Sequence, residues 1–349
     1  MKHKIFFTLV LSCIVIAADC QVSKRDSIKN EVDNYVQTVS RAAAVFLNRR
    51  LPTEERLKAI APHAVIYDEK QIAQFKQTVL SSDETPEIRA MALSRLYPHV
   101  EKDDALYRQT IAWFSNPQTP PVLRRETLNL ISNLSFSSLI GVLDVYPKMV
   151  QDPDPDFRMF AISRLMMNGD ARTEQLLIRG LEDPSSALVK PADAIELLSL
   201  TPKKDYYPTV FKVLTDTKDE AARLAAVQAL GAYKEARQKL VSISRDPNEK
   251  EDFRVSALIA LYSGDKDNIV SYVAPILQDK TATPRLQTTG IQMTINVRKT
   301  MVYRKSKTAR RSDDYDQKIR DIAEGRGVLT NPEVRETANK YLLLVKPNF

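Results

Sequence analysis

The segments DPDFRMFAISRL (residues 154–165) and EDFRVSALIAL (residues 251–261) are two copies of one pattern, and this pattern decides the fold. In each copy an apolar residue precedes an arginine, and apolar or small side chains return three or four and then eight residues later. This spacing places them on one face of a helix. Related segments begin at Thr85, Pro120, Glu220 and Asn331.

The basic residue of each copy is called its marker here. The markers are Arg56, Arg89, Arg124, Arg158, Lys190, Arg223, Arg254, Arg285 and Arg335. The first seven intervals between them are 31 to 35 residues long, and the last is 50. A second helical segment follows in nearly every unit. One two-helix unit cannot bury its apolar face alone, whereas a stack of units buries a continuous core, so the sequence predicts an array of helical repeats.

Composition supports an all-helical chain. Only 8 of the 349 residues are glycine, whereas 19 are proline. Tight β-turns and phosphate-cradling loops depend on glycine for positive φ or close backbone approach. The sequence therefore disfavours β-sandwiches and nucleotide-binding α/β folds.

Short polar residues before proline separate the units, and an aspartate stands six to eight residues before several markers. These aspartates are Asp83, Asp152, Asp216 and Asp246. An aspartate in the turn and an arginine on the next helix resemble the HEAT-repeat family, especially its shorter form related to phycobilisome-lyase repeats. The resemblance implies a right-handed α-solenoid (superhelix) of about 8–9 two-helix repeats, in which the aspartate and the arginine pair between neighbouring units.

We expect three segments along the chain. Residues 1–20 read as a signal peptide, residues 21–49 as an N-terminal capping helix, and residues 50–349 as the repeat array. The capping helix has an apolar face that is suited to covering the open end of the stack. This face comprises Val32, Tyr35, Val36, Val39, Ala43 and Phe46.

The first twenty residues have the features of an export signal. Lys2 and Lys4 precede an apolar run from Ile5 to Ala18, which is too short to span a bilayer comfortably. Cys20 stands near the position of the acylated cysteine of bacterial lipoproteins, but Asp19 replaces the small residue of that motif. We therefore expect an exported protein, periplasmic or extracellular, with lipid anchoring at Cys20 as the alternative and membrane contact only in that case.

A basic insertion near residues 298–312 accounts for the long last interval. Residues 298–311 read RKTMVYRKSKTARR and contain no acidic residue, while the whole chain has a net charge of +7. The seven basic residues are Arg298, Lys299, Arg304, Lys305, Lys307, Arg310 and Arg311. Two interpretations stay open: a solvated connection between helices, or a contact for an anionic partner.

Catalytic and metal-binding motifs are missing from the sequence. There is no GxSxG, CxxC, P-loop, GxGxxG or HExxH motif. His63 and His99 occupy similar places in two units, but no further ligand completes a zinc site. Asp193 is expected to reach solvent or a partner base, and Trp113 is expected to pack. We predict no catalytic residue, no cofactor and no metal.

Three functions compete at this stage. The first is an exported, non-catalytic scaffold that binds a protein partner on the concave face, lined by the second helix of each unit. The second is binding of an anionic surface or polyanion through Arg298–Arg311, although export disfavours nucleic acid. The third, an enzyme or enzyme auxiliary, follows only from the lyase-type HEAT resemblance.

Overall fold

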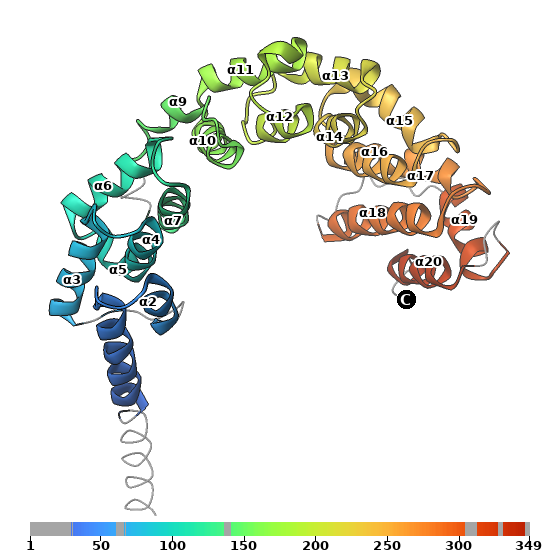
Figure 1. The fold of residues 1–349 in the computed structure, drawn as a ribbon. Coiled ribbons are helices and arrows are strands. Elements are labelled where there is room, and N and C mark those ends of the chain that lie inside the picture. Colours follow the sequence, from blue (N-terminus) through green and yellow to red (C-terminus); the bar gives the residue numbers. More distant parts are fainter. Residues whose placement is uncertain are drawn as a thin grey trace, which may run out of the picture. The chain divides into compact units, whose positions relative to one another are not determined.

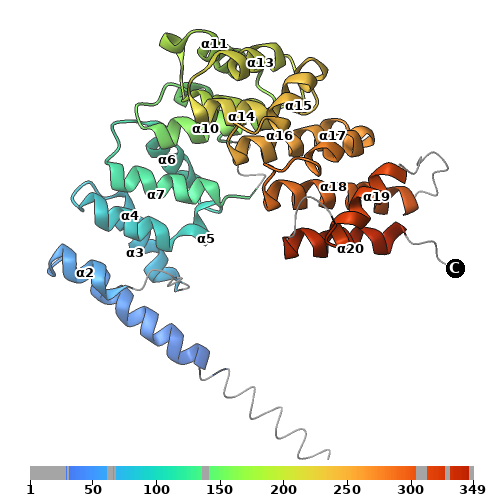
Figure 2. The same cartoon turned by 90° about the vertical axis from the view of Figure 1, so that its right-hand side faces the viewer.

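The computed structural model is all-helical, as the sequence predicts (Figures 1 and 2). The residues that it describes are 29, 31–60, 66, 68–135, 141–303, 313–326 and 331–345. None of these residues lies in a β-strand. The chain divides into two compact units, Met1–Phe157 and Arg158–Phe349, and the division falls within helix α10 (Pro155–Met167).

The first unit consists of short helices that pack on their neighbours in sequence. They are a helix over residues 31–47, α2 (Thr53–Ala59), α3 (Glu69–Leu80), α4 (Pro86–Arg95), α5 (Tyr97–Val100), α6 (Asp104–Ser115), α7 (Pro121–Ser132) and α9 (Tyr146–Met149). Helix α4 contacts α2, α3 and α7, and α7 also contacts α6. Aromatic side chains fill part of this core, with the rings of Phe46 and Phe75 stacked 5.1 Å apart.

The second unit repeats one helix pair several times. Its helices are α11 (Ala171–Glu182), α12 (Pro191–Leu198), α13 (Tyr207–Asp216), α14 (Glu220–Ala229), α15 (Arg237–Arg245), α16 (Glu251–Gly264), α17 (Ile269–Ile276), α18 (Pro284–Tyr303), α19 (Asp313–Ala323) and α20 (Pro332–Val345). Each even-numbered helix from α12 to α20 contacts the next even-numbered one, and each odd-numbered helix packs on the even-numbered helix that follows it. We call α2, α4, α7, α10, α12, α14, α16, α18 and α20 the marker helices, because each carries a marker or the position aligned with one. We call α3, α6, α9, α11, α13, α15, α17 and α19 the companion helices.

The predicted turn residues begin several marker helices. The Thr85 hydroxyl accepts a hydrogen bond from the Ile88 N–H at the start of α4, and Pro86 is the first helical residue. In the turn before α14, Asp219 and not the expected Asp216 is the capping residue, and its side chain accepts bonds from two backbone N–H groups. A side-chain oxygen satisfies N–H groups that lack an intrahelical partner, and proline has no such group to lose.

The markers share one helical position in most units. The N–H of each donates to the carbonyl of the N-cap residue, which makes it the fourth residue of its helix; this holds for Arg56, Arg89, Arg124, Arg223, Arg254 and Arg335. Two assignments from the sequence are wrong. Ala194 holds this position in α12, where Lys190 is the N-cap, and Gln287 holds it in α18, two residues after Arg285.

The marker arginines connect successive helical repeats. The Arg56 Nε donates to the Phe46 carbonyl at 2.7 Å, and the Arg124 Nε donates to the Phe114 carbonyl at 3.1 Å. The equivalent bonds of Arg89 and Arg254 also reach a carbonyl ten residues earlier. Each such bond satisfies a carbonyl at the end of the preceding helix, which has no partner inside its own helix.

The other end of the guanidinium reaches a carboxylate in the following turn. The pairs are Arg56–Glu84, Arg124–Asp152, Arg223–Glu249 and Arg254–Asp279. The two partners are 25 to 28 residues apart, so each pair connects one helical repeat to the next. The predicted pairing between units is correct for Asp152, whereas Glu84 and Glu249 take the roles expected of Asp83 and Asp246.

The N-terminal helix covers the first unit only with its second half. Val39, Ala43 and Phe46 are buried. Val32, Tyr35 and Val36 lie further toward the N-terminus on the same face and are 42–53% exposed.

Candidate binding surface

A groove crosses three marker helices of the first unit. It has a volume of about 570 Å³. Its lining comes from α2 (Leu57), α4 (Glu87, Ala90, Met91, Ser94) and α7 (Pro121, Val122, Arg125, Glu126). Small side chains at Ala90 and Ser94 leave room between the two longer helices, because residues three and four apart share one face.

The floor of the groove is apolar and its rim is charged. Val122 is 41% exposed there, although it is a large apolar residue at the start of α7. Glu126 accepts a hydrogen bond from the Tyr97 hydroxyl at 2.5 Å, and burial together with this bond raises the pKa of Tyr97. Arg125 pairs with Asp156 at 2.5 Å. Glu126 and Arg125 are thus held in place by partners outside the groove.

This groove does not lie where the sequence places a binding face. The sequence predicts a face lined by the second helix of each repeat, and the groove is lined by marker helices. The companion helix α6 instead carries long charged side chains on its exposed side, such as Arg108, which pairs with Asp104.

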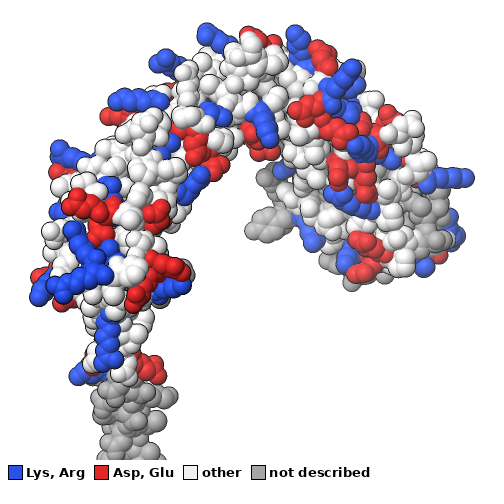
Figure 3. All heavy atoms as spheres, in the orientation of Figure 1, with Lys and Arg blue, Asp and Glu red and all other residues white. Residues whose placement is uncertain are grey.

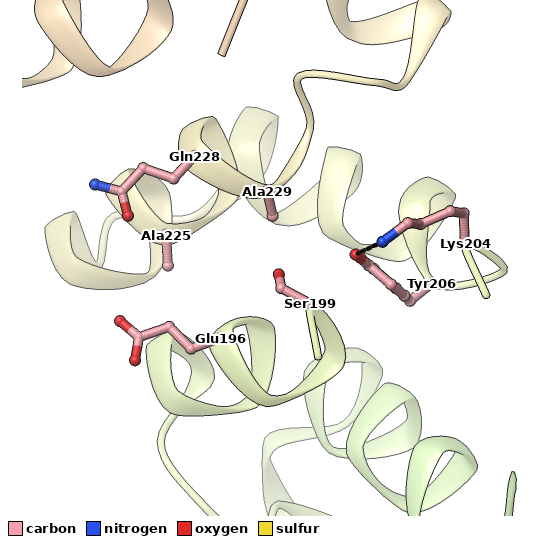
Figure 4. Close-up of a pocket in the computed structure, with 7 residues that line it drawn as sticks. All are labelled: Glu196, Ser199, Lys204, Tyr206, Ala225, Gln228 and Ala229. Atoms are coloured by element: carbon pink, nitrogen blue, oxygen red, sulfur yellow. Dashed lines mark hydrogen bonds between the residues drawn. The ribbon is translucent and has the colours of Figure 1, made fainter. Parts of the chain in front are cut away.

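A smaller hollow lies between α12 and α14 of the second unit (Figure 4). Its volume is about 330 Å³. The residues that line it are Glu196, Ser199, Lys204, Tyr206, Ala225, Gln228 and Ala229. Glu196 and Gln228 face each other at one end, and Lys204 and Tyr206 lie at the other (Figure 4).

Three polar side chains of this hollow, Ser199, Lys204 and Tyr206, take part in local bonds. The Lys204 ammonium donates to the Tyr206 hydroxyl at 3.3 Å and to the Thr201 carbonyl at 3.2 Å. The Ser199 hydroxyl donates to the Ile195 carbonyl at 2.9 Å. Burial raises the pKa of Tyr206, which keeps its hydroxyl protonated at neutral pH.

The basic insertion divides between described and undescribed residues. The sequence suggests that Arg298 faces solvent or an anionic partner. In the structure its side chain is 13% exposed and pairs with the buried carboxylate of Asp316 at 3.2 Å. Lys299 is exposed. Arg304, Lys305, Lys307, Arg310 and Arg311 lie outside the described residues.

Asp316 organises a polar cluster among the last three helices. Besides Arg298, it accepts a hydrogen bond from the Tyr341 hydroxyl at 2.6 Å. The Tyr315 and Thr294 hydroxyls lie 3.0 Å apart, and the rings of Tyr315 and Tyr341 meet edge to face. Burial raises the pKa of both tyrosines. Arg298 is thus part of the structural core rather than of an anion-binding surface.

The remaining candidate residues from the sequence contact other parts of the fold, are partly buried, or lie outside the described residues. His99 Nε2 lies 2.9 Å from the Ile66 carbonyl, while His63 and Cys20 are not among the described residues. Asp193 is half-buried, as expected of a group that reaches solvent. The described part of the chain contains no group of three or more His, Cys, Asp or Glu that is suited to hold a metal ion.

Acidic and basic side chains are interspersed on the face of the molecule shown in Figure 3. Lys250 and Glu220 are one pair of opposite charges that connects neighbouring repeats. No helix among the described residues is both long and apolar enough to cross a membrane.

Sequence reasoning missed two kinds of residue. Glu84 and Glu249 immediately precede the N-cap of the next marker helix, and this position is the signal that identifies them. Gln287 replaces an arginine at the marker position and is fully buried. Neither a scan against protein-family models nor a search of curated proteins finds a match to this chain.

Proposed function

We propose that the chain is a HEAT-like α-solenoid and serves as an exported, non-catalytic scaffold for a protein partner. The solenoid assignment is supported by the alternation of marker and companion helices and by the arginines that link successive units. About 8–9 repeats follow from the marker intervals of the sequence. Residues 1–20 supply the export signal in this proposal.

The groove on α2, α4 and α7 is the observation that carries the binding function. It combines two apolar side chains, the exposed Val122 and the half-buried Met91, with charges at Glu87, Arg125 and Glu126. Protein interfaces have such an arrangement, with an apolar centre and a polar rim that sets register.

Site-specific photocrosslinking tests this function. A photoreactive amino acid is placed at Val122 in the groove or, as a control, at Arg108 on the companion helix α6, whose side chain is 76% exposed. Each protein is incubated with its own envelope and secreted fractions and irradiated. We expect one defined protein adduct from position 122, absent from position 108 and lost when Met91→Glu is added.

Adducts of equal pattern from both positions would contradict the groove as the binding surface. Repeating the experiment at high salt separates the alternative function. An adduct that forms only at low salt and requires the basic residues 298–311 would assign binding to that stretch and to an anionic partner.

A further inference from the structure

Arg89 lacks the carboxylate partner that four other marker arginines have. Arg56, Arg124, Arg223 and Arg254 each pair with an acidic residue of the following turn. The Nε of Arg89 makes the usual bond to a companion-helix carbonyl, that of Val79, at 3.0 Å. Its guanidinium then lies over the Trp113 ring, 5.1 Å from the centroid. Among the described residues, no acidic side chain bonds or pairs with it.

The reason is found in the turn before α7. Glu84 and Glu249, which pair with Arg56 and Arg223, immediately precede the N-cap residues of α4 and α16. The equivalent residue before α7, whose N-cap is Pro120, is Thr119. The turn from Asn116 to Pro120 contains no acidic residue at all.

Thr119 is itself unusual. Its side chain is 5% exposed, yet its hydroxyl has no hydrogen-bond partner among the described residues. A buried hydroxyl without a partner costs about 1–3 kcal/mol, so such groups call for a specific explanation. In addition, no side chain caps the N-terminus of α7, a helix of twelve residues, so the N–H groups of its first turn keep free donors.

The electrostatics agree with an unfilled position. Burial lowers the pKa of Arg89, and no neighbouring carboxylate offsets this effect. A partly buried guanidinium without a counter-ion is destabilising, and it gains most from a planar carboxylate that accepts two of its N–H bonds. The helix N-terminus adds a partial positive charge on the same side as Thr119.

We propose that Arg89, Thr119 and the N-terminus of α7 form a binding site for a carboxylate that is not supplied by the repeat itself. The ligand takes the place that the Glu84 carboxylate has in the neighbouring unit. The guanidinium fork donates to its oxygens, and the Thr119 hydroxyl and the first-turn N–H groups of α7 donate to the remaining lone pairs. The ligand class is a carboxylic acid, whether a free small acid or an acidic side chain of a bound protein.

The site can be tested without knowledge of the natural ligand. The full mature chain, labelled with ¹⁵N-arginine, is titrated with sodium acetate while sodium chloride keeps the ionic strength constant. The Arg89 Nε signal is identified by its absence in Arg89→Lys. We expect a saturable shift of this signal, whereas the Arg124 signal stays in place because its carboxylate position is occupied by Asp152.

Two variants exchange, between neighbouring repeats, the residue that precedes the N-cap of the marker helix. Thr119→Glu supplies the missing carboxylate, so it should abolish the acetate response of Arg89 and raise the unfolding midpoint. Glu84→Thr creates the same vacancy beside Arg56 and should transfer an acetate response to the Arg56 signal. Thr119→Glu alone is sufficient for the test if Glu84→Thr fails to fold.

Several outcomes overturn the proposal. If acetate leaves the Arg89 signal unchanged in the parent protein, the vacancy is closed to ligands. If inorganic phosphate shifts the signal and acetate does not, the carboxylate class is wrong. To separate the two sources of carboxylate, N-acetyl-aspartate amide is compared with acetate: tighter binding of the former assigns the site to acidic side chains, and tighter binding of acetate assigns it to small acids.

Discussion

Replacing Asp152 by asparagine tests whether the buried arginine pairs hold the units together. Asp152 accepts bonds from both terminal nitrogens of Arg124, and their side chains are 1% and 4% exposed. Asparagine retains an acceptor oxygen for the N–H of Asp154 but removes the negative charge. Leaving the Arg124 guanidinium buried without a counter-ion should lower the free energy of unfolding by about 3–5 kcal/mol.

The control is a pair of the same charge type that water reaches. Lys250 and Glu220 also link neighbouring units, but each side chain is 65% exposed. Glu220→Gln should therefore cost less than about 1 kcal/mol. Urea unfolding followed by circular dichroism gives both values, and hydrogen exchange of the α7 amides reports whether the loss is local, which matters in a chain of two units.

A third variant separates the unpaired charge from the lost link. In Arg124→Met with Asp152→Leu, both charges are replaced by apolar side chains, and we expect most of the lost stability to return. If Asp152→Asn costs no more than Glu220→Gln, the buried pair does not stabilise the stack and the reasoning is refuted.

Two further changes test the second unit. Burial and a hydrogen bond to Asp265 raise the pKa of Tyr272 from 10.0 to about 12, so the folded state holds this proton more tightly than the unfolded state. The resulting stability is complete below pH 10.0 and is lost as the pH rises toward about 12, and Tyr272→Phe should reduce this loss when unfolding is measured across that range. Gln287 is fully buried and neither side-chain amide atom has a partner among the described residues, so Gln287→Met should raise the unfolding midpoint, unlike Gln292→Met at an exposed site. A lower midpoint for Gln287→Met would show that the amide is satisfied.

The helical class and the marker arginines could be predicted from the sequence because both depend on local spacing. An apolar stripe and a basic residue on the same helix keep their relation in any helical fold. The choice between Asp83 and Glu84 depends instead on the path of the turn. The longer side chain directly before the N-cap reaches Arg56, and the Asp–Pro pattern gives no sign of this.

The wrong marker assignments also come from the path of the turn, which the sequence does not reveal. Arg285 lies at the expected interval, but the N-cap at Thr283 places Gln287 at the marker position. The groove was not predictable because it combines residues from three helices that are separate in sequence. Arg298 was misjudged for a similar reason, since its partner Asp316 lies beyond the basic stretch.

The bonds of the marker arginines also determine where this chain can be cut and rejoined. A fragment that ends after α9 but before Asp152 keeps the bond from Arg124 to Phe114 but lacks the carboxylate that pairs with Arg124. Shortened or hybrid arrays should therefore be joined after the acidic residue, within the first turn of the next marker helix. The segment to transfer runs from one marker arginine to the acidic residue that pairs with it. It therefore contains parts of two successive helix pairs.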